Sequence, residues 1–457
     1  MKRLLLIFLA TVVVSCSFDN KTGIWKDASN TPADNQIPES IENNNSNIKE
    51  EDILTKNKTF SEEKKPLNPS LISIGPPIQI INLFERYVTS TNNISNLSFS
   101  DNKVLLTKGK KLNKMSYDKA YSNRDVVFYK NNFISYDNSG TIFIYSSKLK
   151  KKIFEYNFYK KKYKKFNKKI YLIVNKNTLY AADNLGYLYA LNLDNNSILW
   201  AKNYGIPFRS NLKFAESQIF LANQDNVIYS INPNNGDKNW QFPTSITFLK
   251  SDFENNFALD IVNNQLFFLN TSGELYSINY LSQNIKWVLN FKKTALAEDT
   301  ELFLGQPIIF KNNNLIISTE KRILSYKAET GIKNWDLYAE PVVKPIATLD
   351  YTYIVLKNNL LLCVENFTGN VIWSKNIFRN IEKNKIKERF DMIIDFKIVN
   401  SMINIYFKNG YLLSFNPSNG ISNFPYRISK NGINSKIFYL DNNMFFLDGK
   451  SRLLQYN

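Results

Sequence analysis

The sequence predicts an all-β protein: an eight-bladed β-propeller of four-stranded antiparallel blades, preceded by a disordered, lipid-anchored tether. Three observations support this prediction. A stretch ending in an aromatic residue recurs along the chain, alternating apolar runs with turn residues surround each copy, and the first 75 residues differ from the rest in composition.

The repeat is clearest in VIYSINPNNGDKNW, residues 227–240. Its other copies are found at 187–200, 274–287, 323–335 and 360–373, with weaker ones at 141–154 and 411–424. An eighth begins at 452–457, where the given sequence stops. Self-similarity at a fixed period is the signature of a repeat architecture, so each copy predicts one structural unit.

An aromatic residue ends each of the seven copies. These residues are Phe154, Trp200, Trp240, Trp287, Trp335, Trp373 and Phe424. They lie 38 to 51 residues apart, with a mean of 45, and include five of the six tryptophans of the chain. Because neighbouring blades stack face to face, we expect these side chains to fill the wedge between blades, which is a packing role and not a cofactor role.

Each period holds four short strands. A second apolar run precedes each copy, and pieces such as Asn184-Leu185-Gly186 and Thr271-Ser272-Gly273 separate the two. Asn and Gly tolerate the positive φ that tight hairpin turns need. Four strands in about 45 residues match a propeller blade. The truncated eighth blade needs an outer strand from elsewhere, and we expect Asn102–Lys108 to supply it, which would remove the exposed sheet edges.

The N-terminus predicts export. Lys2 and Arg3 precede an apolar run, Leu4–Val14, that is too short to span a bilayer comfortably. Residues 1–15 therefore predict a signal peptide. The boundary Val-Val-Ser-Cys resembles the bacterial lipobox, which implies that Cys16 is lipidated with palmitate-type chains. Ser17 after it resembles the pattern of lipoproteins exported to the outer membrane, on its periplasmic face.

Residues 16–75 are rich in Asn, Ser, Lys, Glu and Pro and have few apolar residues. Such a segment cannot bury enough surface to offset its ordering entropy. We expect a lipid-anchored, disordered linker over 16–75 and the propeller over 76–457.

Composition limits the chemistry. The chain has no histidine, which removes the commonest general base and the commonest zinc ligand. A Ser-His-Asp or Cys-His site is therefore impossible. Cys363 alternates inside an expected strand and predicts a buried, inert thiol. We expect no catalytic residue, no metal and no cofactor.

The stretch from Ser210 to Trp240, SNLKFAESQIFLANQDNVIYSINPNNGDKNW, resembles the repeat of PQQ-like β-propellers. With the lipobox, the number and order of repeats over about residues 110–457 resemble the BamB family of outer-membrane assembly lipoproteins. The resemblance implies a scaffold and not an enzyme. Such a scaffold docks on a POTRA domain of BamA and assists folding and insertion of outer-membrane β-barrels, with unfolded outer-membrane proteins as further partners.

The resemblance also places the docking residues on connections between blades near the middle of the propeller. One patch corresponds here to Thr247, Phe248, Leu249 and Lys250. The second patch of the family is acidic, and Asp299 and Glu301 occupy that neighbourhood. Lys250 replaces an arginine of the family, and Lys is a poorer bidentate partner for a carboxylate.

Two other functions share these features. A quinoprotein dehydrogenase dependent on PQQ has the same repeat, but this chain lacks adjacent cysteines and an evident carboxylate cluster for Ca²⁺. A propeller that binds an anionic envelope surface would use the net charge of +18 and the lysine-rich segment 148–169, KLKKKIFEYNFYKKKYKKFNKK. A mixture of lysine and aromatic residues can bind nucleic acid, but an exported lipoprotein rarely meets it, so we expect no nucleic-acid partner.

Overall fold

The computed structural model describes residues 16–18, 25–27, 58–68, 72–102, 104–112, 124–159, 163, 166–246, 253–292, 303–379, 390 and 392–457. The chain divides into two units, Met1–Lys56 and Asn57–Asn457. In the first unit, β1 (Cys16–Phe18) pairs antiparallel with β2 (Trp25–Asp27). The expected signal peptide lies outside the described residues. Within the described part, no helix is long and apolar enough to cross a membrane.

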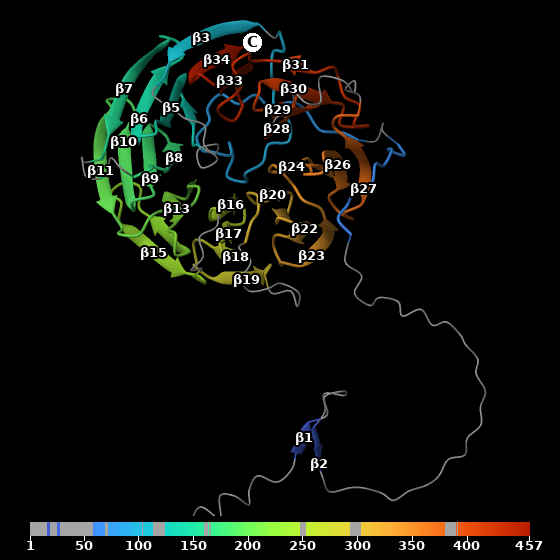
Figure 1. Cartoon of the computed structure of the whole chain (residues 1–457). Helices are drawn as coiled ribbons and strands as arrows, with labels where there is room; N and C mark the ends of the chain where they lie inside the picture. Colours follow the sequence, from blue (N-terminus) through green and yellow to red (C-terminus); the bar gives the residue numbers. More distant parts are fainter. Residues whose placement is uncertain are drawn as a thin grey trace, which may run out of the picture. The chain divides into compact units, whose positions relative to one another are not determined.

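The second unit is a ring of eight four-stranded antiparallel sheets (Figure 1), which confirms the predicted fold. We number these sheets as blades 1 to 8 in chain order. The strands of blades 1 to 4 are β4 (Val127–Tyr129), β5 (Asn132–Tyr136), β6 (Thr141–Ser146), β7 (Lys151–Asn157), β8 (Ile170–Asn175), β9 (Thr178–Asp183), β10 (Tyr187–Asn192), β11 (Ser197–Asn203), β12 (Lys213–Ala215), β13 (Gln218–Ala222), β14 (Val227–Ile231), β15 (Lys238–Pro243), β16 (Asn256–Asp260), β17 (Gln265–Leu269), β18 (Glu274–Asn279) and β19 (Ile285–Asn290).

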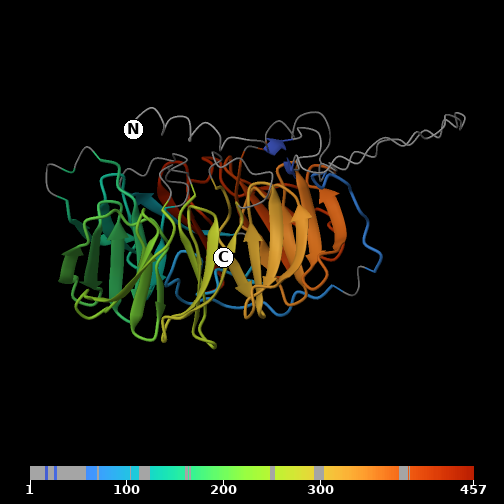
Figure 2. The same ribbon diagram turned by 90° about the horizontal axis from the view of Figure 1, so that it is seen from below.

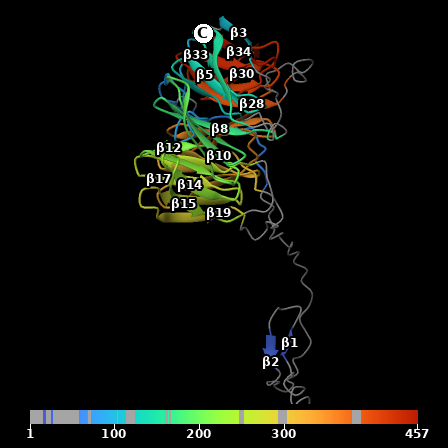
Figure 3. The same cartoon turned by 90° about the vertical axis from the view of Figure 1, so that its left-hand side faces the viewer.

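Blades 5 to 8 continue the same arrangement around the ring. Their strands are β20 (Ile309–Lys311), β21 (Asn314–Ser318), β22 (Arg322–Lys327), β23 (Lys333–Tyr338), β24 (Ile346–Ala347), β25 (Tyr351–Val355), β26 (Leu360–Glu365), β27 (Val371–Asn376), β28 (Ile393–Val399), β29 (Met402–Phe407), β30 (Tyr411–Phe415), β31 (Tyr426–Arg427), β32 (Phe438–Leu440), β33 (Asn443–Leu447), β34 (Arg452–Tyr456) and β3 (Leu105–Lys111). Figures 2 and 3 show the blades from the side, with strands running between the two faces of the ring (Figure 2; Figure 3).

The outer strand of blade 8 comes from the N-terminal side of the chain, as expected. Strand β3 pairs with β34, with Leu105 opposite Tyr456 and Lys111 opposite Arg452. The predicted range, 102–108, is displaced by three residues from the observed one, 105–111. This pairing completes the fourth strand of blade 8, so the outer side of β34 is not left unpaired.

The sequence pattern explains the local structure of each blade. In blade 3, β13 pairs with β14 in the register Ile219 to Ile231 and Leu221 to Tyr229, and these side chains are buried. Both faces of a middle strand are covered because a blade lies on each side, and the apolar runs are therefore nearly continuous. The turn between the strands closes where the Asn223 side chain accepts a hydrogen bond from the Val227 amide at 2.9 Å.

The repeat tryptophans join successive blades. The indole nitrogen of Trp373 in blade 6 donates to the Pro417 carbonyl, in the β30–β31 connection of blade 7, at 2.9 Å. Gly420 in that connection has φ +68°, and a Cβ there would come within 2.7 Å of the Trp373 ring. Glycine thus provides both the turn and the space for the ring. Trp200, Trp287 and Trp335 donate in the same way to carbonyls of the following blade.

Phe424 does not have the expected packing role, because its side chain is 94% exposed. The expectation rested on the repeat alone. In blade 8, however, the outer strand is β3 and arrives from the other end of the chain. Blade 8 therefore has no hairpin turn between its third and fourth strands to receive an aromatic residue from blade 7. The outer strand of blade 7, β31, is also only two residues long.

Residues 78–100, which we call the inner ring segment, run once around the inside of the propeller (Figure 1). Hydrogen bonds from the backbone or from side chains join this segment to each of the eight blades in order. The contacts made by the segment are Ile80 to Asp441, Leu83 to Phe128, Phe84 to Val174, Thr89 to Lys213, Ser90 to Leu259, Thr91 to Phe310, Asn93 to Ala347 and Leu97 to Ile398. The segment then closes on itself, since Ile78 pairs with Leu97.

Buried charges fix the inner ring segment in place. The Lys213 ammonium in blade 3 is buried and forms an ion pair with Glu85 of the segment. The Arg86 guanidinium lies 3.3 Å from the Asp125 carboxylate of blade 1 and 2.8 Å from the Glu254 carboxylate beside blade 4. A buried charge that loses its partner is strongly destabilising, so these pairs make the position of the segment specific.

The expected linker to residue 75 is shorter on its C-terminal side than predicted. The Phe60 amide donates to the Tyr338 carbonyl in blade 5 at 2.7 Å, and Lys64 forms a β-bridge with Ser374 at the edge of blade 6. Ile72 and Ile74 are buried in the core between blades 6 and 7. The prediction missed these contacts because isolated apolar residues in a polar segment carry no strand periodicity.

We predict that Trp373→Ala lowers the free energy of unfolding by about 3–5 kcal/mol, because it leaves a cavity between blades 6 and 7. Phe424→Ala is the matched control and should change it by less than about 0.5 kcal/mol, because that side chain lies in solvent. Urea unfolding followed by circular dichroism measures both. Equal losses in the two variants would show that the repeat position itself, and not the turn of the next blade, determines packing.

Candidate functional site

The predicted docking residues fall on two connections between blades. Thr247, Phe248, Leu249 and Lys250 belong to the connection from blade 3 to blade 4, and Asp299 and Glu301 to the connection from blade 4 to blade 5. All six lie outside the described residues. The structure describes the residues on which each connection is rooted, and these define where the connections leave the propeller.

The first connection is anchored on turns of blades 3 and 4 before it leaves the ring. The Thr244 hydroxyl donates to the Asn226 carbonyl at 2.7 Å. The Ser245 hydroxyl donates to the Glu274 carboxylate at 2.8 Å, and its carbonyl accepts from the Ser272 hydroxyl at 3.0 Å. Ile246, the last described residue before the predicted docking stretch, is 59% exposed.

The second connection starts beside the same turn. The Phe291 amide donates to the Gly273 carbonyl at 2.9 Å. Where the two connections re-enter the ring, Phe253 and Phe303 pack edge to face with ring centroids 5.1 Å apart. The β17–β18 turn of blade 4, residues 270–273, therefore lies between the starts of both connections. The described roots of the two connections are therefore neighbours, an arrangement that suits a single interface.

The lysine-rich segment 148–169 is only partly a charged surface. Lys151 and Lys152 on β7 are exposed, together with Ile153. Lys168, by contrast, is buried, donates to the Phe166 and Tyr163 carbonyls and lies 4.9 Å above the Tyr159 ring. The exposed lysines among the described residues of this segment lie on and just before β7, the outer strand of blade 1.

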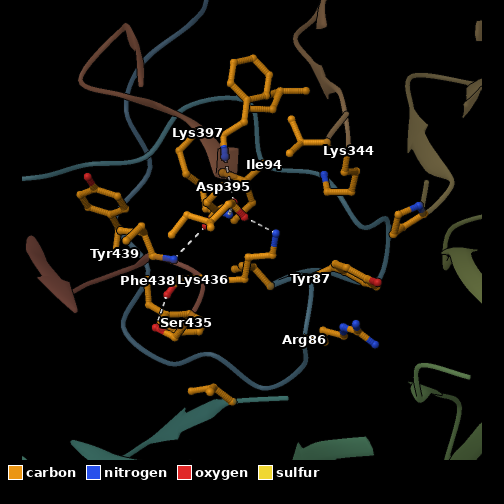
Figure 4. A pocket seen from close by; sticks show the side chains of 18 of the residues that line it. Arg86, Tyr87, Ile94, Lys344, Asp395, Lys397, Ser435, Lys436, Phe438 and Tyr439 are labelled. Carbon is orange, nitrogen blue, oxygen red and sulfur yellow. Dashed lines mark hydrogen bonds and ion pairs between the residues drawn. The ribbon is translucent and has the colours of Figure 1, made fainter. Parts of the chain in front are cut away.

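A central cavity of about 300 Å³ lies within the ring (Figure 4). Its lining combines the inner ring segment, including Arg86 and Ile94, with the starts of the innermost strands of blades 1, 5, 6, 7 and 8. The inner ring segment bonds to the opposite ends of these strands, as Leu97 does to Ile398 near the end of β28. The segment therefore forms the floor of the cavity. No sequence motif indicated it, since its residues lie outside the repeat positions.

The cavity lining is cationic. Lys344, Lys397 and Lys436 come from blades 6, 7 and 8, and Figure 4 shows them around Asp395. The Asp395 carboxylate accepts hydrogen bonds from the Phe396 and Ile437 amides at 2.9 and 2.8 Å. It also lies 3.3 Å from the Lys397 ammonium. Asp395 is the one carboxylate among the described lining residues, so three lysines share one negative charge.

Burial and mutual repulsion perturb the lysines. The Lys344 ammonium donates to the Pro345 carbonyl at 3.3 Å, a neutral partner. Burial, together with repulsion from Lys397, lowers the pKa of Lys344 to about 7, although Asp395 opposes the change. Burial also lowers the pKa of Lys436, whose ammonium donates to the Ile394 carbonyl.

Cys363 lies in β26 and is buried, as its alternation predicted. Burial raises the pKa of its thiol to about 12, which leaves the thiol protonated and unreactive at neutral pH. Among the described residues, no group of three or more carboxylate or thiol side chains is placed to hold a metal ion.

Comparison with known proteins identifies the repeat. The family model described as "Outer membrane protein assembly factor BamB" matches residues 147–375, half of the chain. A sequence search of curated proteins finds no match.

Three solved structures illustrate the fold similarity. BamB from Moraxella catarrhalis is 10% identical with a TM-score of 0.59, covering 78% of this chain and 99% of that protein. The computationally designed Ika8 protein is 10% identical with a TM-score of 0.55, covering 77% and 99%. Quinohemoprotein alcohol dehydrogenase from Comamonas testosteroni is 9% identical with a TM-score of 0.57, covering 82% and 80%. At such identities the likeness shows the fold alone.

We predict that Lys344→Met stabilises the protein below pH 7. The folded-state pKa lies below the usual 10.5, so between pH 7 and 10.5 the unfolded chain binds more protons and stability rises with pH. The stability advantage of the variant over the wild type should therefore shrink by about 1–3 kcal/mol from pH 7 to pH 9. Urea unfolding in sodium chloride buffers at several pH values measures it. A constant difference would mean that Lys344 titrates normally.

Proposed function

The chain belongs to the family of the outer membrane protein assembly factor BamB, and from this we propose that it is a non-catalytic scaffold of outer-membrane β-barrel assembly. In this role it docks on a POTRA domain of a BamA-like assembly protein and assists folding and insertion of barrel proteins. One observation carries the proposal beyond family membership: both predicted docking connections are rooted beside the 270–273 turn of blade 4.

Paired connections suit a docking surface because the propeller holds their roots rigidly. Phe253 and Phe303 lock the returning ends together, and Thr244 and Ser245 fix the start of the first connection. Phe248 and Leu249 supply apolar anchors, and Lys250 and the acidic pair Asp299 and Glu301 supply charge, the composition of an interface centre and its rim.

The proposed location is the periplasmic face of the outer membrane, with Cys16 as the lipidated residue. The support is the lipobox-like boundary in the sequence and the family to which the chain belongs. Mass spectrometry of the mature N-terminus tests this part, since a free Cys16 thiol or cleavage at another residue would contradict it.

A quinone-dependent dehydrogenase fits the described residues less well. Dehydrogenases of that fold use Ca²⁺, a hard cation that prefers several carboxylate and carbonyl oxygen ligands. The cavity lining instead combines three lysines with the single carboxylate of Asp395. A divalent cation would be repelled there, so the donor set does not match such a site.

We predict that the double change Phe248→Ala and Leu249→Ala weakens binding to isolated POTRA domains by about 2–4 kcal/mol, as the loss of a small hot spot would. Lys250→Glu should weaken it further and alter its salt dependence, because an attractive charge pair becomes repulsive. Calorimetry with the unlipidated chain, Cys16→Ser, measures the affinity.

The matched control is Leu349→Ala with Phe367→Ala. Leu349 lies in the β24–β25 turn and Phe367 in the β26–β27 turn of blade 6, and both are exposed. These turns are on the face of the propeller opposite the connections between blades, so the two changes should leave the affinity unchanged. If the Phe248 and Leu249 double variant is folded and binds like the wild type, the connection after Trp240 is not the docking surface, and the exposed edge of blade 1 around Lys151 becomes the next candidate.

A further inference from the structure

We propose that the central cavity is a binding site for a small polyanion that carries phosphate or carboxylate groups. This site is separate from the proposed docking connections and goes beyond a scaffold function. It is formed by the inner ring segment and by Lys344, Lys397 and Lys436, which three different blades bring to the space around Asp395 (Figure 4).

The charge balance within the cavity calls for an anion. The Asp395 carboxylate already accepts hydrogen bonds from the Phe396 and Ile437 amides, which use part of its capacity to accept hydrogen bonds. Its ion pair is with the Lys397 ammonium, at 3.3 Å, and it also attracts Lys344 and Lys436 at longer range. Lys344 and Lys436 are left with carbonyl partners, those of Pro345 and Ile394. Both lysines are half-buried. Partly desolvated cations whose hydrogen bonds go only to neutral carbonyls are costly, and an anion between them would offset that cost.

The other charges near the cavity do not correct the imbalance. Arg86 and Arg124 also line it. The carboxylate partners of Arg86, Asp125 and Glu254, are already in ion pairs, and Glu254 pairs with Lys169 as well. Lys213 lies close enough to disfavour the charged form of Lys344, and its own ion pair is with Glu85. The described groups that face Lys344 thus add positive charge on balance.

Size and access are suitable for a small ligand. A volume of about 300 Å³ is at the lower end of the range for small-molecule sites. Val342 and Met392 in the lining are more than a third exposed, so the cavity communicates with solvent on that side. Apolar residues such as Ile346 and Phe396 complete the wall. Such a wall strengthens a charge–charge contact by excluding water.

Protonation couples to this binding. Because Lys344 has its pKa at about 7, an anion would favour the protonated form and draw a proton from solution. Proton uptake provides a readout that nonspecific attraction to surface lysines would not produce.

Titration calorimetry of the Cys16→Ser chain with pyrophosphate and with citrate, at pH 7.5 and constant ionic strength in chloride, tests the proposal. We expect one site, and a heat of binding that depends on the ionisation enthalpy of the buffer, because a proton is taken up. Tighter binding of pyrophosphate would identify a phosphate ligand, and tighter binding of citrate would identify a carboxylate ligand.

Lys344→Met should weaken binding of the better probe at least ~10-fold and reduce the proton uptake seen in the buffer dependence, because it removes a cation that titrates near neutral pH. Lys357→Met is the matched control: Lys357 is exposed, pairs with Glu340 and lies outside the cavity, so the affinity should not change. Lys436→Met provides a second, independent cavity variant.

Three results would overturn the proposal: absence of binding by both probes, equal weakening by the Lys357 control, or wild-type affinity in both cavity variants. None of these results bears on the docking connections, whose test uses POTRA domains and not small anions. A failure here would therefore leave the proposed scaffold function as it stands.

Discussion

The inner ring segment is the constraint on which the rest of this propeller depends. Residues 78–100 contact each of the eight blades, and the segment closes on itself through Ile78 and Leu97. Its ion pairs, Glu85 with Lys213 and Arg86 with Asp125 and Glu254, are buried or nearly so. Removing one partner would leave a charge in a low-dielectric interior, so the segment cannot slide to another register without a large cost.

Two consecutive segments near the N-terminal side of the propeller close the ring. The inner ring segment ties the innermost strands, and β3 then completes the outside of blade 8 by pairing with β34. Between these closures the tryptophan of one blade reaches the turn of the next, as Trp373 does with Pro417. Together these contacts make a rigid frame. A rigid frame suits a scaffold, because connections rooted on it lose less entropy when a partner binds.

Sequence reasoning succeeded where the structure repeats. Trp200 and Trp335 mark their blades because the indole, the turn and the glycine recur together, and eight units followed from counting them. The predicted packing role of Phe424 is wrong for a reason outside the repeat, namely that blade 8 lacks the turn that would receive the side chain. The inner ring segment could not be predicted, since each of its contacts is made once, with a different blade, and no period records them.

The functional residues divide in the same way. Lys344 and Lys436 lie on connections before an innermost strand, outside the repeated positions, so only the folded ring brings them beside Lys397. In sequence they are ordinary members of a lysine-rich chain. The proposed docking stretch around Phe248 was predicted by resemblance to a family. Non-repeated segments on a repeated frame thus hold both the proposed docking surface and the proposed anion site.

Native-state hydrogen exchange, resolved by peptide mass spectrometry, tests the central claim most directly. The Leu83 and Leu97 amides donate to Phe128 and Ile398 in the innermost strands of blades 1 and 7. If the inner ring segment is an integral part of the fold, these amides exchange only by global unfolding, at the same rate as the Leu221 amide within blade 3. Exchange more than ~100-fold faster at Leu83 and Leu97, with Leu221 still protected, would show that the segment detaches while the blades stay folded, and would contradict this account.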